Sequence, residues 1–201
     1  MATGREIKDI YDMMQKICDE TSKLISVIND MLINEEFEAV GDGSVMLNKS
    51  KHYLYSKYWL PYFLQRVYIR KPNVMKGVGI NIMFDGSIDG LENKIPFLTC
   101  GFVDFSEGQL TKGNALYKAG WTEHEEVEKS FNGNLCTTTY TDGVTATTYF
   151  LPLEVVSSQE NVNMYVIRPL ICMYKGEYIE ADNMVNKVAI GLKDIIGQVK
   201  S

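Results

Sequence analysis

Several residue patterns that mark common classes of enzyme are missing from this sequence. Its 201 residues contain only two histidines, His52 and His124, which lie far apart in the chain, so a histidine-rich metal centre is not expected. The four cysteines form no Cys-x-x-Cys pair, which argues against a zinc ribbon or a thioredoxin-like motif. Neither common type of glycine-rich phosphate-binding loop is present. The sequence therefore predicts no catalytic residue, no metal site and no cofactor.

Long apolar runs are also missing, and no stretch approaches the length that spans a bilayer. The first dozen residues include acidic side chains and no apolar run as long as a signal-peptide core. We therefore expect a soluble, cytoplasmic protein that does not engage a membrane. The widely scattered cysteines, most of them in apolar surroundings, are interpreted as buried free thiols.

What is present fits an ordinary globular chain, with 45% hydrophobic and 23% charged residues. Residues 1–201 are expected to form a single domain. The pattern of elements favours an α+β fold, a mostly antiparallel β-sheet covered by long N-terminal and C-terminal helices, with a short helical insertion.

A long helix is predicted near the N-terminus, over residues 4–38. Thr3 and Glu6 have the spacing of a capping box, in which each side chain satisfies a backbone N–H of the other residue. From Ile7 onward, apolar residues recur every seven positions in three neighbouring rows, which include Ile10, Ile17 and Leu24. Such a wide apolar face indicates either a core helix or a helix that also self-associates.

The remaining elements are predicted from alternation, turn residues and caps. Residues 63–70 alternate, with Phe63, Gln65, Val67 and Ile69 on one face. Asp142-Gly143 is the strongest hairpin signal. The expected elements are short strands at 45–47 and 52–58, a strand at 63–70, a central hairpin of 78–84 and 96–105, an acidic helix at 122–131, a hairpin of 135–140 and 144–151, an edge or bulged strand at 163–174 around Pro169, and a C-terminal helix at 182–199. Residues 44–176 are thus expected to be mainly β.

A basic and aromatic segment is the strongest functional signal. Residues 44–84 contain seven Lys or Arg and no Asp or Glu, although the whole chain has a formal net charge of −6. Seven aromatic residues are interleaved with these cations between residues 49 and 76. Aromatic and arginine side chains are the anchors that dominate interfaces. We expect partner binding at Lys57, Tyr58, Trp59, Tyr62, Arg66, Arg70 and Lys71.

The same segment has a plain structural interpretation. Its aromatic side chains could fill the core, and its cations could pair with acids of the first helix, which has nine Asp or Glu against four Lys or Arg over residues 5–38. Cations beside aromatic rings also suit nucleotides or nucleic acid, but the acidic whole chain weakens any general attraction to polyanions.

Three weaker motifs involve acidic residues. Asp85, Ser87 and Asp89 match the start of a calcium loop, but Pro96 occupies the position of the essential glutamate, so a hairpin connection is favoured. With Glu92, the same acids would serve a metal-dependent enzyme that acts on nucleotides or nucleic acid. His124 lies among glutamates and is interpreted as part of a solvated helix face.

The sequence thus favours a non-enzymatic binding or regulatory domain that self-associates through its N-terminal helix. Residues 49–76 would engage a protein or a small ligand. The alternative is a protein that binds nucleotides or nucleic acid, including a metal-dependent enzyme.

Overall fold

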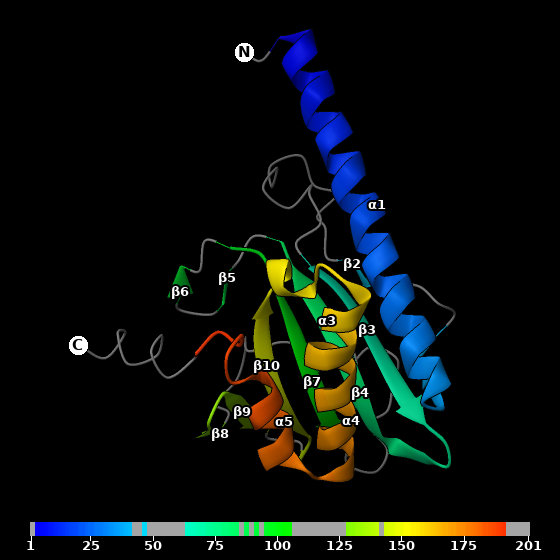
Figure 1. The fold of residues 1–201 in the computed structure, drawn as a ribbon, viewed down its shortest axis with the longest axis vertical. Helices are drawn as coiled ribbons and strands as arrows, with labels where there is room; N and C mark the ends of the chain where they lie inside the picture. The colour runs from blue at the N-terminus through cyan, green and yellow to red at the C-terminus, as the bar shows by residue number, and fades with distance from the viewer. Residues whose placement is uncertain are drawn as a thin grey trace, which may run out of the picture.

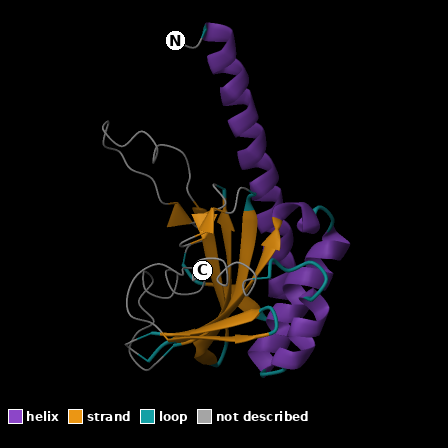
Figure 2. Cartoon of the chain, turned by 90° about the vertical axis from the view of Figure 1, so that its left-hand side faces the viewer, coloured by secondary structure: helices purple, strands orange, loops and turns teal. Residues whose placement is uncertain are grey.

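The computed structural model describes residues 3–41, 46–47, 63–84, 87–88, 91–92, 95–105, 128–140 and 143–191. These residues form an α+β fold in which helices pack on one face of an antiparallel sheet (Figures 1 and 2). The fold class predicted from the sequence is confirmed, although several elements differ from the prediction.

Helix α1 (Gly4–Asn34) begins at the predicted capping box. The backbone N–H of Thr3 donates to Glu6 Oε2 at 2.6 Å, and the N–H of Glu6 donates to Thr3 Oγ1 at 3.3 Å. The helix ends four residues before the predicted end, because Glu36 adopts a left-handed φ of 66° and turns the chain. Phe37 then becomes buried against Tyr174, with ring centroids 5.0 Å apart, and begins a strand.

Eight strands form the main sheet, in the order β1-β3-β4-β7-β10-β9-β8, with β2 also paired to β3. The predicted strand at 63–70, the central hairpin and the hairpin around Asp142-Gly143 are confirmed. The strands are β1 (Phe37–Ala39), β2 (Met46–Leu47), β3 (Phe63–Arg70), β4 (Asn73–Met83), β7 (Phe97–Asp104), β8 (Glu128–Asn132), β9 (Leu135–Thr139) and β10 (Thr145–Pro152). A separate pair joins β5 (Ser87–Ile88) to β6 (Leu91–Glu92).

The two faces of the sheet have different contents, because successive side chains of a strand point to opposite faces. The face toward the helices carries the larger core, in which Ile28 and Leu32 of α1 meet Ile80 and Leu98 of the sheet. A second apolar cluster occupies the other face and contains Val67, Val103, Phe105, Val144 and Ala146. Both faces of the central strands are therefore buried.

The strand predicted at 163–174 is wrong, because this segment is helical. It follows η2 (Leu153–Val156) and runs through α3 (Gln159–Val162), a π-helical turn η3 (Asn163–Ile167) and α4 (Arg168–Lys175). The described part of residues 44–176 is for the same reason less β-rich than predicted. The buried residues Val162, Val166, Leu170 and Met173 recur every three or four positions, so they line one side of a helix.

Pro169 is tolerated inside this helical run because its missing N–H is replaced. The carbonyl that an N–H at position 169 would normally bond belongs to Tyr165. The hydroxyl of Tyr149, on the neighbouring β10, donates to that carbonyl at 2.9 Å and approaches the carbonyl of Val166 at 3.3 Å. A side chain from the sheet thus satisfies the helix where proline cannot.

Two further helix predictions need correction. The acidic helix predicted at 122–131 is wrong over Glu128–Phe131, which belong to β8 and pair with β9; residues 122–127 lie outside the described part. The C-terminal helix predicted at 182–199 overlaps α5 (Tyr178–Val185) but begins earlier, and residues 186–191 are not helical. After Asn186 the chain turns back, and the N–H of Ile190 donates to the carbonyl of Phe150 at 2.8 Å. Residues 192–199 lie outside the described part.

Among the described residues, no helix combines the length and the apolar character needed to cross a membrane.

Candidate functional site

The predicted partner-binding residues fall into two groups. Lys57, Tyr58, Trp59 and Tyr62 lie outside the described residues, as does the predicted strand at 52–58. Arg66 and Arg70 belong to β3, and Lys71 follows in the turn to β4. Of the alternative metal-binding acids, Glu92 ends β6, whereas Asp85 and Asp89 are not described.

The described cations of the basic segment contact the protein's own side chains. Arg66 donates to Asn29 of α1 at 3.3 Å, and its guanidinium lies 5.7 Å from the ring centre of Tyr68. Arg70 pairs with Glu36, and this hydrogen bond raises the pKa of the Arg70 guanidinium. These contacts agree with the structural interpretation of the cations.

Two lysines extend this pattern of internal pairing. Lys71 Nζ lies 2.8 Å from Glu38 of β1, and Lys76 Nζ lies 3.6 Å from Asp104 of β7. Both pairs are well exposed, and exposed ion pairs contribute little to stability. These ion pairs do not test whether the segment binds a partner, so that role stays a prediction.

The N-terminal half of α1 presents an apolar face to solvent. This half of the helix extends beyond the sheet, whereas the C-terminal half packs against it (Figures 1 and 2). Five of its large apolar side chains are between 46% and 65% exposed, Met14 is less exposed, and Ile28 and Leu32 further along are fully buried. The exposed residues are Ile7, Ile10, Tyr11, Met13 and Ile17. We call these five residues the apolar face of α1.

A groove begins where α1 reaches the body of the protein. It has a volume of about 360 Å³ and lies between α1 and the segment 153–162. Its apolar lining consists of Leu24, Val27, Ile82, Leu153, Val156 and Val162, and its polar lining of Glu20, Thr21, Lys23, Ser157, Ser158 and Gln159. Ile10, Ile17 and Leu24 are spaced by seven residues, so the apolar face of α1 runs directly into this groove.

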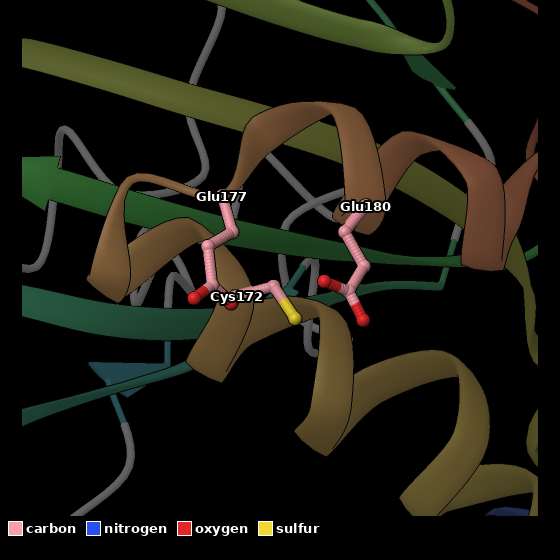
Figure 3. Close-up of side chains that lie close together, drawn as sticks. All are labelled: Cys172, Glu177 and Glu180. Carbon is pink, nitrogen blue, oxygen red and sulfur yellow. The ribbon is translucent and has the colours of Figure 1, made fainter.

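A third feature is a cluster of Cys172, Glu177 and Glu180 around the turn that joins α4 to α5 (Figure 3). Gly176 makes this turn with a left-handed φ of 85°. The Cys172 sulfur and one carboxylate oxygen from each glutamate lie within 4.8 Å of one another. Figure 3 shows both carboxylates beside the cysteine; Glu177 comes from the residue before α5 and Glu180 from the first turn of α5.

The chemistry of this cluster favours a protonated thiol. Burial raises the pKa of Cys172, the charge of Glu180 raises it further, and a hydrogen bond to Glu177 acts in the same direction. A cysteine attacks as a nucleophile or binds a metal as its thiolate. The cluster is therefore built to keep the thiol unreactive, which does not suit catalysis.

Sequence reasoning did not identify this cluster. Glu177 and Glu180 carry no motif, and the interpretation of 163–174 as a strand placed Cys172 away from them. The signal that could have found them is Gly176, because glycine one residue past a helix end is a common C-terminal cap that reverses the chain.

Comparisons with known proteins give no relative for this chain. No protein family, no curated protein and no solved structure matches it.

Proposed function

We propose that the protein is a non-enzymatic binding module that self-associates through the N-terminal half of α1. The observation that carries this proposal is the apolar face of α1, which extends from the body of the protein while its five large side chains remain in solvent. An exposed apolar patch of this kind typically marks an interaction site. Burying one isoleucine contributes roughly 1.5–3 kcal/mol, so a few of them would support a stable contact.

A second copy is the partner that fits this surface. Each chain offers a projecting apolar helix and, further along the same helix, an apolar groove. Two copies crossing in antiparallel fashion near Ile17 would bring Ile10 of each beside Leu24 of the other, at the groove. Such an arrangement uses the same patch twice and closes on itself with two-fold symmetry.

A second binding partner, distinct from the second copy of the chain, is proposed from the sequence alone. We propose that the basic and aromatic residues 49–76 bind a protein or a small ligand. The internal ion pairs of Arg70 and Lys71 support a structural role for part of this segment, and they do not favour nucleic acid. A cytoplasmic location likewise stays a prediction.

The test is the oligomeric state of purified protein, measured by light scattering and sedimentation over about 1–100 μM, a range that brackets micromolar dissociation constants. Ile17→Lys and Ile10→Lys should each weaken the dimer at least tenfold, because each loses about 1.5–3 kcal/mol of apolar burial. Asp12→Lys places a lysine on the side of the helix away from Ile10 and Ile17, where Asp12 contacts Lys8, and should leave the dimer intact. A monomeric wild-type protein throughout this range would overturn the proposal.

The antiparallel orientation has its own readout. In a Cys18→Ser background, Ile10→Cys and Leu24→Cys variants are oxidised separately and as a mixture. Antiparallel pairing predicts crosslinked dimers that contain one chain of each variant. A parallel pair would instead link each variant to itself.

A further inference from the structure

The turn between α4 and α5 brings together three side chains of the kinds that bind metal ions. Cys172 lies in the last turn of α4, Glu177 precedes α5, and Glu180 lies in the first turn of α5. Gly176 reverses the chain between the two helices, and the backbone N–H of Glu177 donates to the carbonyl of Cys172 at 2.8 Å. This hydrogen bond holds the start of α5 against the end of α4, so the three side chains converge from two helices (Figure 3).

The three potential ligand atoms are already close to the spacing that a metal ion requires. The Cys172 sulfur and one oxygen from each of the two glutamates all lie within 4.8 Å of one another. Around a tetrahedral zinc ion, sulfur and oxygen ligands lie roughly 3.4–3.6 Å from each other, given metal–ligand distances of about 2.3 Å and about 2.1 Å. Both glutamates are exposed, so small rotations of their side chains suffice to close the difference.

The buried thiol gives the cluster a fixed ligand that an acidic surface patch lacks. Cys172 is 8% exposed and belongs to the main core. A free cysteine usually behaves as a small hydrophobe among apolar neighbours, whereas Figure 3 shows this sulfur between the carboxylates of Glu177 and Glu180. The packing of α4 therefore holds the thiol in place, while the carboxylates reach it from the solvent side.

The mixed set of donor atoms narrows the class of ion. Calcium and magnesium are bound by oxygen and take six or more ligands, whereas zinc accepts sulfur and carboxylate oxygen together in four-coordinate sites. Two carboxylates and a thiolate carry three negative charges, which suits a divalent cation. Three protein ligands leave the fourth position to water.

We propose that Cys172, Glu177 and Glu180 bind a divalent ion of the zinc class, with water as the fourth ligand. The glutamates that raise the pKa of the free thiol would also attract the ion. The ion would displace the thiol proton to solvent, because cysteine binds metals as its thiolate. Once bound, it would join the end of α4 to the start of α5. This proposal does not rest on self-association, which involves α1 alone.

The experiment titrates the full chain with zinc chloride by calorimetry, using protein without a histidine tag in a Cys18→Ser background. This background removes the exposed thiol of α1. Cobalt(II) is titrated in parallel, because a cobalt–thiolate bond gives a charge-transfer absorption that carboxylate ligands do not give. We expect one ion per chain for both metals, a cobalt–thiolate absorption, and a higher melting temperature with zinc, since a ligand that binds only the folded state stabilises it.

Variants assign the binding to the three side chains. Cys172→Ser keeps the shape of the side chain and removes the thiolate, so it should abolish the cobalt–thiolate absorption and the zinc-induced rise in melting temperature. Glu177→Gln and Glu180→Gln change exposed side chains and should fold normally. Each should weaken zinc binding by roughly tenfold or more, because even the outer partners of metal ligands have effects of that size. Glu160→Gln, which removes one negative charge from α3, is the matched control and should bind zinc as the background protein does.

Three results would overturn the proposal. These are no binding by the background protein at up to about 100 μM zinc, zinc binding that Cys172→Ser leaves unchanged, and equal weakening by Glu160→Gln and Glu180→Gln. The second result would place the ion elsewhere on the chain, and the third would show only a general attraction of cations to an acidic protein. The dimer test is independent, because each chain holds the complete cluster. Ile17→Lys in the same background should therefore bind zinc with unchanged affinity.

Discussion

At the scale of single residues, Cys172 shows how neighbours set the reactivity of a side chain. Its thiol is largely buried and lies beside Glu177 and Glu180. All three of the leading influences raise its pKa, and at a given pH a higher pKa means less thiolate. Cys18, in contrast, is exposed on the surface of α1.

Removing the glutamate charges should therefore make Cys172 more reactive. Glu180→Gln and Glu177→Gln each lower its pKa, so the rate of alkylation by iodoacetamide near pH 8 should rise a few-fold, since thiolate is the reacting form. The rate is measured by mass spectrometry of the modified peptide in a Cys18→Ser background. Glu160→Gln, on α3, is the control. A rate that stays the same or falls in both cluster variants would contradict the assigned causes.

At the scale of elements, the helical run from Gln159 to Lys175 depends on the sheet for one of its hydrogen bonds. Tyr149→Phe removes the donor that serves the carbonyl of Tyr165. Leaving this carbonyl unsatisfied should lower the free energy of unfolding by about 1–2 kcal/mol, which urea titration can measure.

A double-mutant cycle separates this effect from lost packing. Pro169→Ala returns a backbone N–H that can bond Tyr165, so Tyr149→Phe should cost less in that background. Equal costs in the two backgrounds would show that the hydroxyl does not replace the missing N–H.

The same segment explains where sequence reasoning fails. Local signals were strong at the Thr3 cap and at the Asp142-Gly143 turn, and both features were predicted correctly. Over 163–174, the β-branched Val166 and Ile167 fit a strand, and Pro169 is interpreted as an edge position or a bulge. The compensation by Tyr149 comes from a residue distant in sequence, and no local pattern reveals it.

The candidate sites divide in the same way. Alternation alone placed Gln65 and Val67 on one face of β3, which is correct. Asn81 of β4 lies opposite Gln65, and Thr99 of β7 lies opposite Asn81. This alignment depends on the register of three strands, which is set by the whole sheet. The apolar rows of α1 were visible in the sequence, but which half would be buried depended on the length of the sheet beneath it.

At the scale of the whole molecule, buried ionisable groups make the fold sensitive to alkali. Burial raises the pKa of Cys100 to about 12, and the pKa values of Tyr68 and Tyr140 also rise to about 12. Tyr149 shifts in the same direction, mainly through burial. In each case the folded state holds a proton that the unfolded chain releases at lower pH.

Stability should consequently fall as the pH rises. An unfolded cysteine ionises near pH 8.5, so between there and about pH 12 Cys100 alone should remove about 1.4 kcal/mol of unfolding free energy per pH unit; below pH 8.5 its contribution is complete. Urea titrations at about pH 8 and pH 10.5 test this expectation. Cys100→Ala should flatten the decline, and equal stability of the wild type at both values would refute the prediction.

The unbroken helix α1 has one further consequence. Ile28 and Leu32 are fixed in the core, whereas Ile10 lies about 27 Å away along the axis, at 1.5 Å per residue from position 28. The helix is thus anchored in the core at one end and extends freely at the other. A force applied near Ile10 would therefore produce a large torque on the packing around Ile28. If two copies associate through this half of the helix, a change in their relative position would be transmitted to the core of each.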